Sequence, residues 1–128
     1  MTLNDLTGQI VDAAFKVHTT LGPGLLESVY AVVMAYELKK RGFHVARQVG
    51  IPIVYETVHL EEGFRADLIV EHQVIVELKS IEEIAPVHKK QLLTYLRLAD
   101  KRVGLLINFN VALIKDGITR VVNQFEDK

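Results

Sequence analysis

The 128-residue sequence predicts a mixed α/β fold, in which helices flank a mixed β-sheet. Two amino-terminal segments carry apolar residues at three- and four-residue spacing, which is typical of amphipathic helices. The middle of the chain is rich in β-branched residues that alternate with polar ones, a pattern that indicates strands. Further on, a helical segment separates two apolar runs, and this strand, helix, strand order predicts a parallel pair of strands.

Predicted helices occupy the first third of the chain. The first covers about 3–20 and ends at Gly22, because a glycine after the last apolar position commonly stops a helix. Pro23 suits the first position of a second helix. Proline has no N–H, and an N–H at this position would have no partner within the helix. That pattern continues to the cations at 39–41, which favour a helix end through its dipole, and it stops at Gly42.

The central region predicts several strands. Segments 43–49 and 51–55 have the composition of strands. Gly50 and Pro52 mark a break or an edge, because proline cannot donate a hydrogen bond to a neighbouring strand. Segment 58–61 is a further candidate strand.

The remaining elements complete the sheet. Runs 64–70 and 74–79 form a predicted hairpin, and a helix covers 86–99. Segment 103–109 is too apolar for a sheet edge and indicates a buried strand, which we expect to pair in parallel with 74–79. Segment 118–122 is a short last strand. The predicted order is therefore helix, helix, three or four strands, helix, strand, strand.

Composition is that of an ordinary globular protein. Hydrophobic residues make up 49% and charged residues 24%, which suits one domain over 1–128. The absence of cysteine excludes a disulfide framework, a thiolate nucleophile and a cysteine-ligated metal site, so oxygen and imidazole chemistry remain. The sequence has no signal-peptide pattern and no apolar run of the roughly 20 residues that cross a membrane. We therefore expect a cytoplasmic location and no membrane partner.

The charge balance is nearly neutral. The formal net charge is −1, from 15 Lys and Arg against 16 Asp and Glu, whereas nucleic-acid-binding proteins more often carry a basic excess. A local basic strip remains compatible with this total, because a metal site concentrates acidic residues that cancel basic ones elsewhere. Lys89, Lys90 and Arg97 are the candidates for phosphate contacts. They are also explained as an ordinary solvated helix face.

Two carboxylates in the predicted hairpin are the feature most indicative of chemistry. If residues 71–73 form the loop, opposing residue numbers sum to 144, and 67 plus 77 is 144. Asp67 and Glu77 are then direct cross-strand neighbours. Like charges at such positions destabilise a sheet, so a bound cation is the simplest reason for the pair. Lys79 shares a face with Glu77, because side chains alternate along a strand.

These residues, in this order, resemble the PD-(D/E)XK nuclease superfamily. In that superfamily an acidic residue and a Glu-x-Lys or Asp-x-Lys triplet lie on adjacent strands. The first half here is Arg65-Ala66-Asp67, with alanine in place of the proline of the family's name. The second half is Glu77-Leu78-Lys79, and Gln91 and Tyr95 follow on the next helix.

A second motif lies upstream of the hairpin. The run Gly24-Leu25-Leu26-Glu27-Ser28-Val29-Tyr30 resembles the heptad that names the small GxxExxY family of the same superfamily. With this heptad, the resemblance covers nearly the whole chain. A Glu-x-Lys triplet alone arises often by chance, but the ordered combination with the upstream acid is much more specific.

The resemblance implies a restriction-endonuclease-like core in α-α-β-β-β-α-β order and a Mg²⁺-dependent enzyme, with Mn²⁺ as an alternative ion. Mg²⁺ chemistry agrees, because this ion prefers oxygen ligands and is commonly held by one or two carboxylates and substrate phosphate. The implied metal ligands are Glu27, Asp67, Glu77 and the backbone carbonyl of Leu78. The catalytic candidates are Glu27, Asp67, Glu77, Lys79 and Gln91, and the substrate-binding candidates are Lys89, Lys90 and Tyr95.

Several of these residues also have a purely structural explanation. An acid such as Glu27 near a helix start interacts favourably with the helix dipole whether or not it binds an ion. The charged residues of the hairpin could form a solvated sheet face, and Gln91 and Tyr95 could simply bond each other, since they are one helical turn apart. His18 and His88 fit capping or core positions better than metal positions, because hard ions do not need imidazole.

The leading functional hypothesis is a metal-dependent phosphodiesterase that hydrolyses DNA or RNA. The alternative is a catalytically idle protein- or nucleic-acid-interaction module that retains the nuclease fold, since a fold does not fix a function. An enzyme acting on a small phosphorylated substrate is a third hypothesis, because it would need no basic groove. The choice between DNA and RNA stays open, as does the oligomeric state, a homodimer included.

Overall fold

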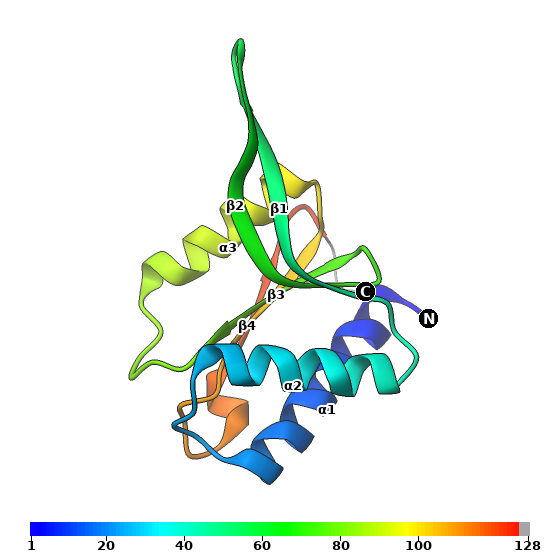
Figure 1. Ribbon diagram of the computed structural model, residues 1–128, viewed down its shortest axis with the longest axis vertical. Helices are drawn as coiled ribbons and strands as arrows, with labels where there is room; N and C mark the ends of the chain where they lie inside the picture. Colours follow the sequence, from blue (N-terminus) through cyan, green and yellow to red (C-terminus); the bar gives the residue numbers. More distant parts are fainter. Residues whose placement is uncertain (126–128) are drawn as a thin grey trace.

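Residues 1–125 are described by a computed structural model in which helices flank one five-stranded sheet (Figure 1). The elements in chain order are α1 (Leu3–Leu21), α2 (Glu27–Lys40), β1 (Val45–Tyr55), β2 (Val58–Val70), β3 (Val74–Lys79), α3 (Pro86–Ala99), β4 (Val103–Asn108), the 3₁₀ turn η1 (Ile114–Gly117) and β5 (Ile118–Val122). The strands lie in the order β1-β2-β3-β4-β5, with β3 parallel to β4 and the other neighbours antiparallel. The predicted mixed sheet flanked by helices is confirmed, including its parallel pair.

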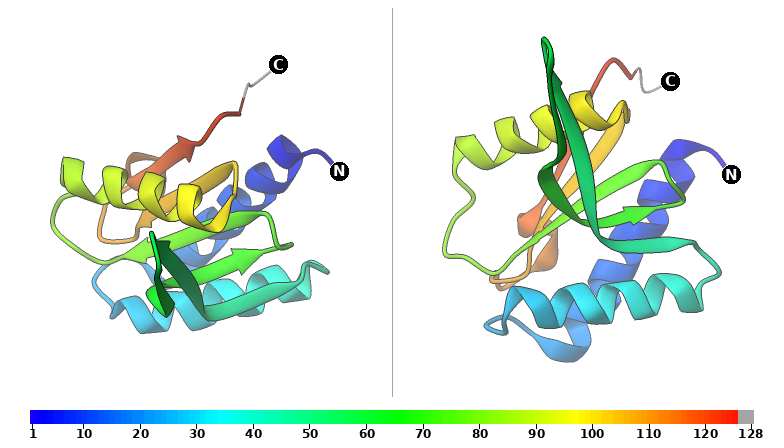
Figure 2. Two further views of the ribbon diagram at one scale, coloured as in Figure 1. Left: turned by 90° about the horizontal axis from the view of Figure 1, so that it is seen from above. Right: turned by 45° about the horizontal axis from the view of Figure 1, so that its top comes forward.

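Helices cover both faces of the sheet, with α1 and α2 on one face and α3 on the other (Figure 2). Side chains alternate along β3 and so supply both cores. Val76 and Leu78 pack in the larger core with α1 and α2. Ile75 packs in the smaller core with Leu92 of α3. The neighbouring strand β4 is buried along its whole length, as its apolar sequence predicts.

The start of the second helix differs from the prediction. α2 begins at Glu27 rather than at Pro23, and residues 22–26 form a loop. Gly22 and Gly24 have φ values of 73° and 96°, which are incompatible with a right-handed helix. The helix signal from Pro23 is wrong because the glycines on either side of it turn the chain away. The loop brings the heptad motif to the end of the sheet.

The first two strands are longer than predicted. The two segments predicted upstream of Tyr55 are parts of β1, and the two predicted downstream of Val58 are parts of β2. Of the two alternatives predicted at Gly50 and Pro52, the edge is confirmed, because β1 lies at the edge of the sheet, whereas Pro52 does not end the strand. The pairing of β1 with β2 is instead locally irregular between Ile51 and Ile53, which an edge strand tolerates. The β1–β2 hairpin therefore extends beyond the rest of the sheet (Figure 1).

An ion-pair network joins α1 to α2. The buried Glu37 carboxylate lies 2.9 Å from Nε of Arg41 and 3.1 Å from Nζ of Lys16. Arg41 also contacts Asp12 of α1 at 2.8 Å. Hydrogen bonds from Arg41 and Lys16 lower the pKa of Glu37, so its charge favours the folded state at neutral pH. The network holds α2, and with it Glu27, against α1.

Gly117→Ala should destabilise the fold, whereas Gly8→Ala should stabilise it. A Cβ at position 117 would lie 2.1 Å from the carbonyl oxygen of Asn108, a backbone atom that cannot rotate away. The expected cost is about 1–3 kcal/mol. Gly8 is exposed on α1 and an added Cβ would meet no atom within 4 Å, so alanine should add roughly 0.5–1 kcal/mol. Urea denaturation measures both changes. An unchanged free energy of unfolding in Gly117→Ala would contradict the packing described around β4.

Candidate active site

The candidate site lies where the antiparallel ladder between β2 and β3 ends. The ladder has three pairs, Leu68 with Val76, Ile69 with Ile75 and Val70 with Val74. Opposing residue numbers therefore sum to 144, and the predicted register is confirmed. Asp67 and Glu77 are the next residues in this register, and their side chains provide the hydrogen bonds that continue from the ladder.

Each carboxylate is held by a backbone amide. The N–H of Asp67 donates to Oε2 of Glu77 at 2.8 Å, and the N–H of Leu78 donates to Oδ2 of Asp67 at 2.8 Å. The side chain of each strand thus bonds the backbone of the other. This reciprocal arrangement fixes the two carboxylates beside each other.

Burial makes the charge of this pair costly. Glu77 is only 8% exposed. Burial raises the pKa of Glu77 from its ordinary 4.5 to about 8, and the nearby charge of Asp67 also raises it. The hydrogen bond from the Asp67 amide and the charge of Lys79 act in the opposite direction but are weaker. A divalent cation at the pair would remove this cost.

The strand geometry directs further groups to the same place. Lys79 is half-buried and follows Glu77 on the same face of β3. In a strand, the N–H and C=O of one residue point to the same edge, and successive residues alternate between the two edges. Since the N–H of Leu78 points to Asp67, the Leu78 carbonyl also faces the β2 edge. The Lys79 carbonyl faces β4, where it accepts from the N–H of Phe109 at 2.9 Å.

Tyr95 faces the acidic pair from α3. Its ring stacks on Phe64 of β2, with centroids 3.8 Å apart and an interplanar angle of 4°. Burial raises the pKa of the Tyr95 hydroxyl, and the charges of Glu77 and Asp67 raise it further. Gln91 is exposed one helical turn earlier on the same side of α3. The tyrosine therefore has a packing partner of its own across the helix–sheet boundary.

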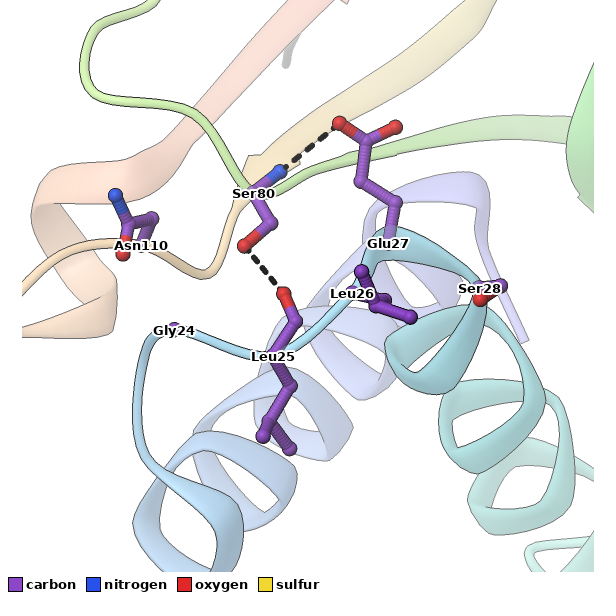
Figure 3. A pocket seen from close by; sticks show the side chains of 7 residues that line it. All are labelled: Gly24, Leu25, Leu26, Glu27, Ser28, Ser80 and Asn110. Atoms are coloured by element: carbon purple, nitrogen blue, oxygen red, sulfur yellow. Dashed lines mark hydrogen bonds between the residues drawn. The ribbon is translucent and has the colours of Figure 1, made fainter.

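Glu27 reaches the end of β3 from the first turn of α2. Its Oε2 accepts a hydrogen bond from the N–H of Ser80 at 3.2 Å, and the Ser80 hydroxyl donates to the carbonyl of Leu25 at 2.6 Å (Figure 3). An open pocket of about 610 Å³ adjoins these contacts. Its lining consists of Gly24, Leu25, Leu26, Glu27, Ser28, Ser80 and Asn110.

The oxygen donors fit a hard divalent ion such as Mg²⁺. The backbone amides occupy Oδ2 of Asp67 and Oε2 of Glu77, so these bonds leave the second oxygen of each carboxylate to a ligand. Within residues 1–125, however, no three His, Asp or Glu side chains gather closely enough to hold one ion. The structure thus pairs Asp67 with Glu77 and places Glu27 separately, at the Ser80 amide.

The predicted phosphate contacts lie in different surroundings. Lys90 is exposed on α3. Lys89 lines a groove together with three acidic residues, Glu82, Glu83 and Asp116. Of the two lysines, Lys90 therefore remains the better candidate for a phosphate contact.

Both histidines considered as alternatives have structural partners. His18 is buried and its Nε2 lies 2.8 Å from the carbonyl oxygen of Val111. Nδ1 of His88 accepts from the N–H of Ala85 at 2.9 Å, at the start of α3. The prediction of core and capping roles is confirmed.

Sequence reasoning missed several residues that organise the site. Ser80 bonds both the loop and Glu27, and only its place directly after the Glu-x-Lys triplet signals it. Asn108 is buried, and its side chain bonds both the N–H and the C=O of Ile81, just beyond β3. A polar residue that ends the apolar β4 run was the available signal. No local sequence signal indicates the role of Phe64, because its partner Tyr95 is distant in sequence.

Residues 4–121 match the family model of the PD-(D/E)XK nuclease superfamily. The chain therefore belongs to this superfamily, and its mixed sheet flanked by helices agrees with a restriction-endonuclease-like fold. Membership points to a nuclease-type phosphodiesterase and to a nucleic acid substrate, and nucleases of this superfamily generally use divalent metal ions. Searches of curated proteins and of solved structures gave no match. Among the described residues, no helix has the length and apolar character needed to cross a bilayer.

The raised pKa of Glu77 should make the folded protein less stable as the pH rises. A carboxyl whose folded pKa is above its unfolded value binds its proton more tightly when folded, so the contribution of Glu77 to stability is greatest below about pH 4.5 and declines until the pH passes about 8. The stability difference between wild type and Glu77→Gln should therefore shift in favour of the glutamine across this window, by up to about 1.4 kcal/mol per pH unit.

Urea denaturation between pH 4 and pH 9, without divalent ions, measures this slope. Glu37→Gln is the matched control, because the pKa of Glu37 is lowered and its contribution is lost in acid instead. A pH-independent difference between wild type and Glu77→Gln would contradict the electrostatic account of the pair.

Proposed function

We propose that the chain is a metal-dependent nuclease of the GxxExxY family that hydrolyses phosphodiester bonds of DNA or RNA at the Asp67–Glu77 pair. The reciprocal hydrogen bonds that hold these two carboxylates side by side carry the proposal. Two adjacent like charges, one of them buried, cost the sheet free energy even though each accepts a backbone hydrogen bond. A site that binds a cation accounts for both the charges and their fixed orientation.

Asp67 and Glu77 would hold Mg²⁺ or Mn²⁺, with the Leu78 carbonyl on the same edge as a further ligand. When bound, the ion would supply charge neutralisation at the scissile phosphate and acidify a coordinated water. The backbone amides keep both carboxylates in place before the ion arrives, so little reorganisation is needed. Glu27, held at Ser80, would act from the pocket side on water or substrate rather than as a ligand of the same ion.

Lys79 would orient the attacking water and stabilise the negative charge that develops on the phosphate. Its position on the face of Glu77 and the partial burial of the residue support this role, because charges interact more strongly near a protein surface than in bulk water. Gln91 would position water or substrate from α3. Tyr95 would contribute its ring and hydroxyl to the wall of the site, where stacking on Phe64 holds it.

Cleavage and metal binding should separate in two variants. Lys79→Ala should lose about 100- to 1000-fold in cleavage rate and retain Mg²⁺ binding, because the ammonium acts on the water and the transition state. Asp67→Asn should lose both, because the amide removes a charged ligand. Calorimetry with Mg²⁺ and Mn²⁺ measures binding, and cleavage is followed on single- and double-stranded DNA and RNA at low salt.

Lys39→Ala is the matched control for these assays, because Lys39 is exposed at the far end of α2. It should cleave and bind metal as wild type does. Cleavage by Lys79→Ala at the wild-type rate would assign the activity to another site or to a contaminant. Metal binding by wild type without cleavage of any of these substrates would favour the idle interaction module or an enzyme of small phosphorylated substrates.

Lys90→Ala should weaken nucleic acid binding in a salt-dependent manner. A lysine that contacts one phosphate contributes about 0.9 to the slope of log K against log salt on duplex DNA, so the slope should become smaller by about that amount. Lys89→Ala should change the slope less, because Lys89 shares its groove with the acidic residues Glu82, Glu83 and Asp116, which repel phosphate. Binding is measured by fluorescence anisotropy between roughly 50 and 200 mM salt. The measurement uses a Lys79→Ala background, in which cleavage is slowed. If log K depends equally on log salt in Lys90→Ala and in its parent, Lys90 does not contact phosphate.

A further inference from the structure

Tyr30, the last residue of the heptad, has contacts that packing alone does not require. It is fully buried in α2, one turn after Glu27. Its hydroxyl donates to the carbonyl of Gly22 at 2.6 Å and accepts from the N–H of Leu25 at 3.2 Å. One side chain thus closes the loop that precedes its own helix.

The same loop is docked on the end of β3. The Leu25 carbonyl accepts from the Ser80 hydroxyl at 2.6 Å, and the Ser80 N–H donates to Glu27 at 3.2 Å (Figure 3). Leu25 is therefore bonded on one side by Tyr30 and on the other by Ser80. Any movement of the loop would displace the Glu27 carboxylate, because only one residue separates Leu25 from Glu27.

A second connection runs from the ring of Tyr30 to Lys79. The ring stacks on Phe109, with centroids 4.3 Å apart and an interplanar angle of 6°. The N–H of Phe109 donates to the carbonyl of Lys79 at 2.9 Å. The hydroxyl of Tyr30 thus holds the Glu27 loop while its ring packs against the residue that holds the end of β3.

We propose that Tyr30 is a positioning residue whose hydroxyl fixes the loop 22–26 and thereby sets the Glu27 carboxylate against Ser80. The effect on the reaction rests on the proposed nuclease function; the effect on the loop does not. Tyr30 touches neither Asp67 nor Glu77 in the described contacts and acts only through Leu25. This assigns a role to each fixed position of the heptad: Gly24 turns the chain, Glu27 supplies the acid, and Tyr30 fixes the loop.

Tyr30→Phe tests this role because it removes the hydroxyl and keeps the ring that stacks on Phe109. Tyr36→Phe is the matched control: it removes the same group from the same helix, at a position that is 67% exposed. With full-length protein and Mg²⁺, Tyr30→Phe should lower kcat about 10-fold or more with KM within about twofold of wild type, by analogy with the loss of one positioned group. Tyr36→Phe should match wild type in both constants.

Amide hydrogen exchange gives a readout that needs no activity. In Tyr30→Phe the Leu25 amide loses its acceptor and should exchange at least about 10-fold faster, as for a loop amide released to solvent. The Ser80 amide should also exchange faster, although it does not touch Tyr30, because its acceptor Glu27 moves. The Leu78 amide, bonded to Asp67, should be unchanged.

The outcomes separate this proposal from the proposed function. Unchanged exchange at Ser80 would overturn the positioning role, whether or not the wild type is a nuclease. Unchanged kcat in a Tyr30→Phe protein whose wild type cleaves would overturn it as well. If the wild type cleaves nothing, the proposed function fails and exchange at Leu25 and Ser80 alone decides the loop's dependence on Tyr30.

A second variant covers the case in which Tyr30→Phe does not fold. Ser80→Ala removes the other bond to Leu25 and lies at the surface of the pocket, where loss of a hydroxyl leaves the core intact. It should also lower kcat without raising KM and speed exchange at Leu25. If both single variants fold, their effects on kcat should be less than multiplicative, because both act on one loop. Independent effects would overturn the shared-loop account.

Discussion

Two like-charged carboxylates held beside each other within a sheet are the constraint on which the rest of this structure depends. Opposed acids ordinarily push strands apart. Here the amide of Asp67 binds Glu77 and the amide of Leu78 binds Asp67, so the strands remain joined while the backbone ladder stops at Leu68 and Val76. Lys79 and the Asp67 amide compensate the charge of the pair only in part, so burial and the neighbouring charge of Asp67 still raise the pKa of Glu77.

The surrounding elements preserve this arrangement. The buried strand β4 supports β3 from its other edge through six parallel pairs, from Val74 with Val103 to Lys79 with Asn108. Asn108 then fixes the chain at Ile81, just past the site. On one face α3 supplies Tyr95, and on the other α2 supplies Glu27. A site of this kind needs groups from several elements, and these elements lie within the matched residues 4–121.

The sequence predicted the parts of this structure that depend on short-range patterns. Alternation and loop length were enough for the register that places Asp67 by Glu77, and apolar spacing was enough for α1 and α3. The start of α2 was missed because proline and glycine signals conflicted, and backbone angles at Gly24 decided between them. Two contacts could not be predicted from the sequence, the Phe64–Tyr95 stack and the Tyr30–Leu25 hydrogen bond. They depend on how elements pack and not on any local pattern.

Paramagnetic broadening by Mn²⁺ tests the central claim, that the end of the β2–β3 ladder is the metal site, most directly. In amide spectra at substoichiometric Mn²⁺, the account predicts that the signals of Asp67 and Leu78 are lost first and that Asp67→Asn abolishes the effect. Broadening centred instead on the acidic groove of Glu82, Glu83 and Asp116, or broadening that survives in Asp67→Asn, would contradict it.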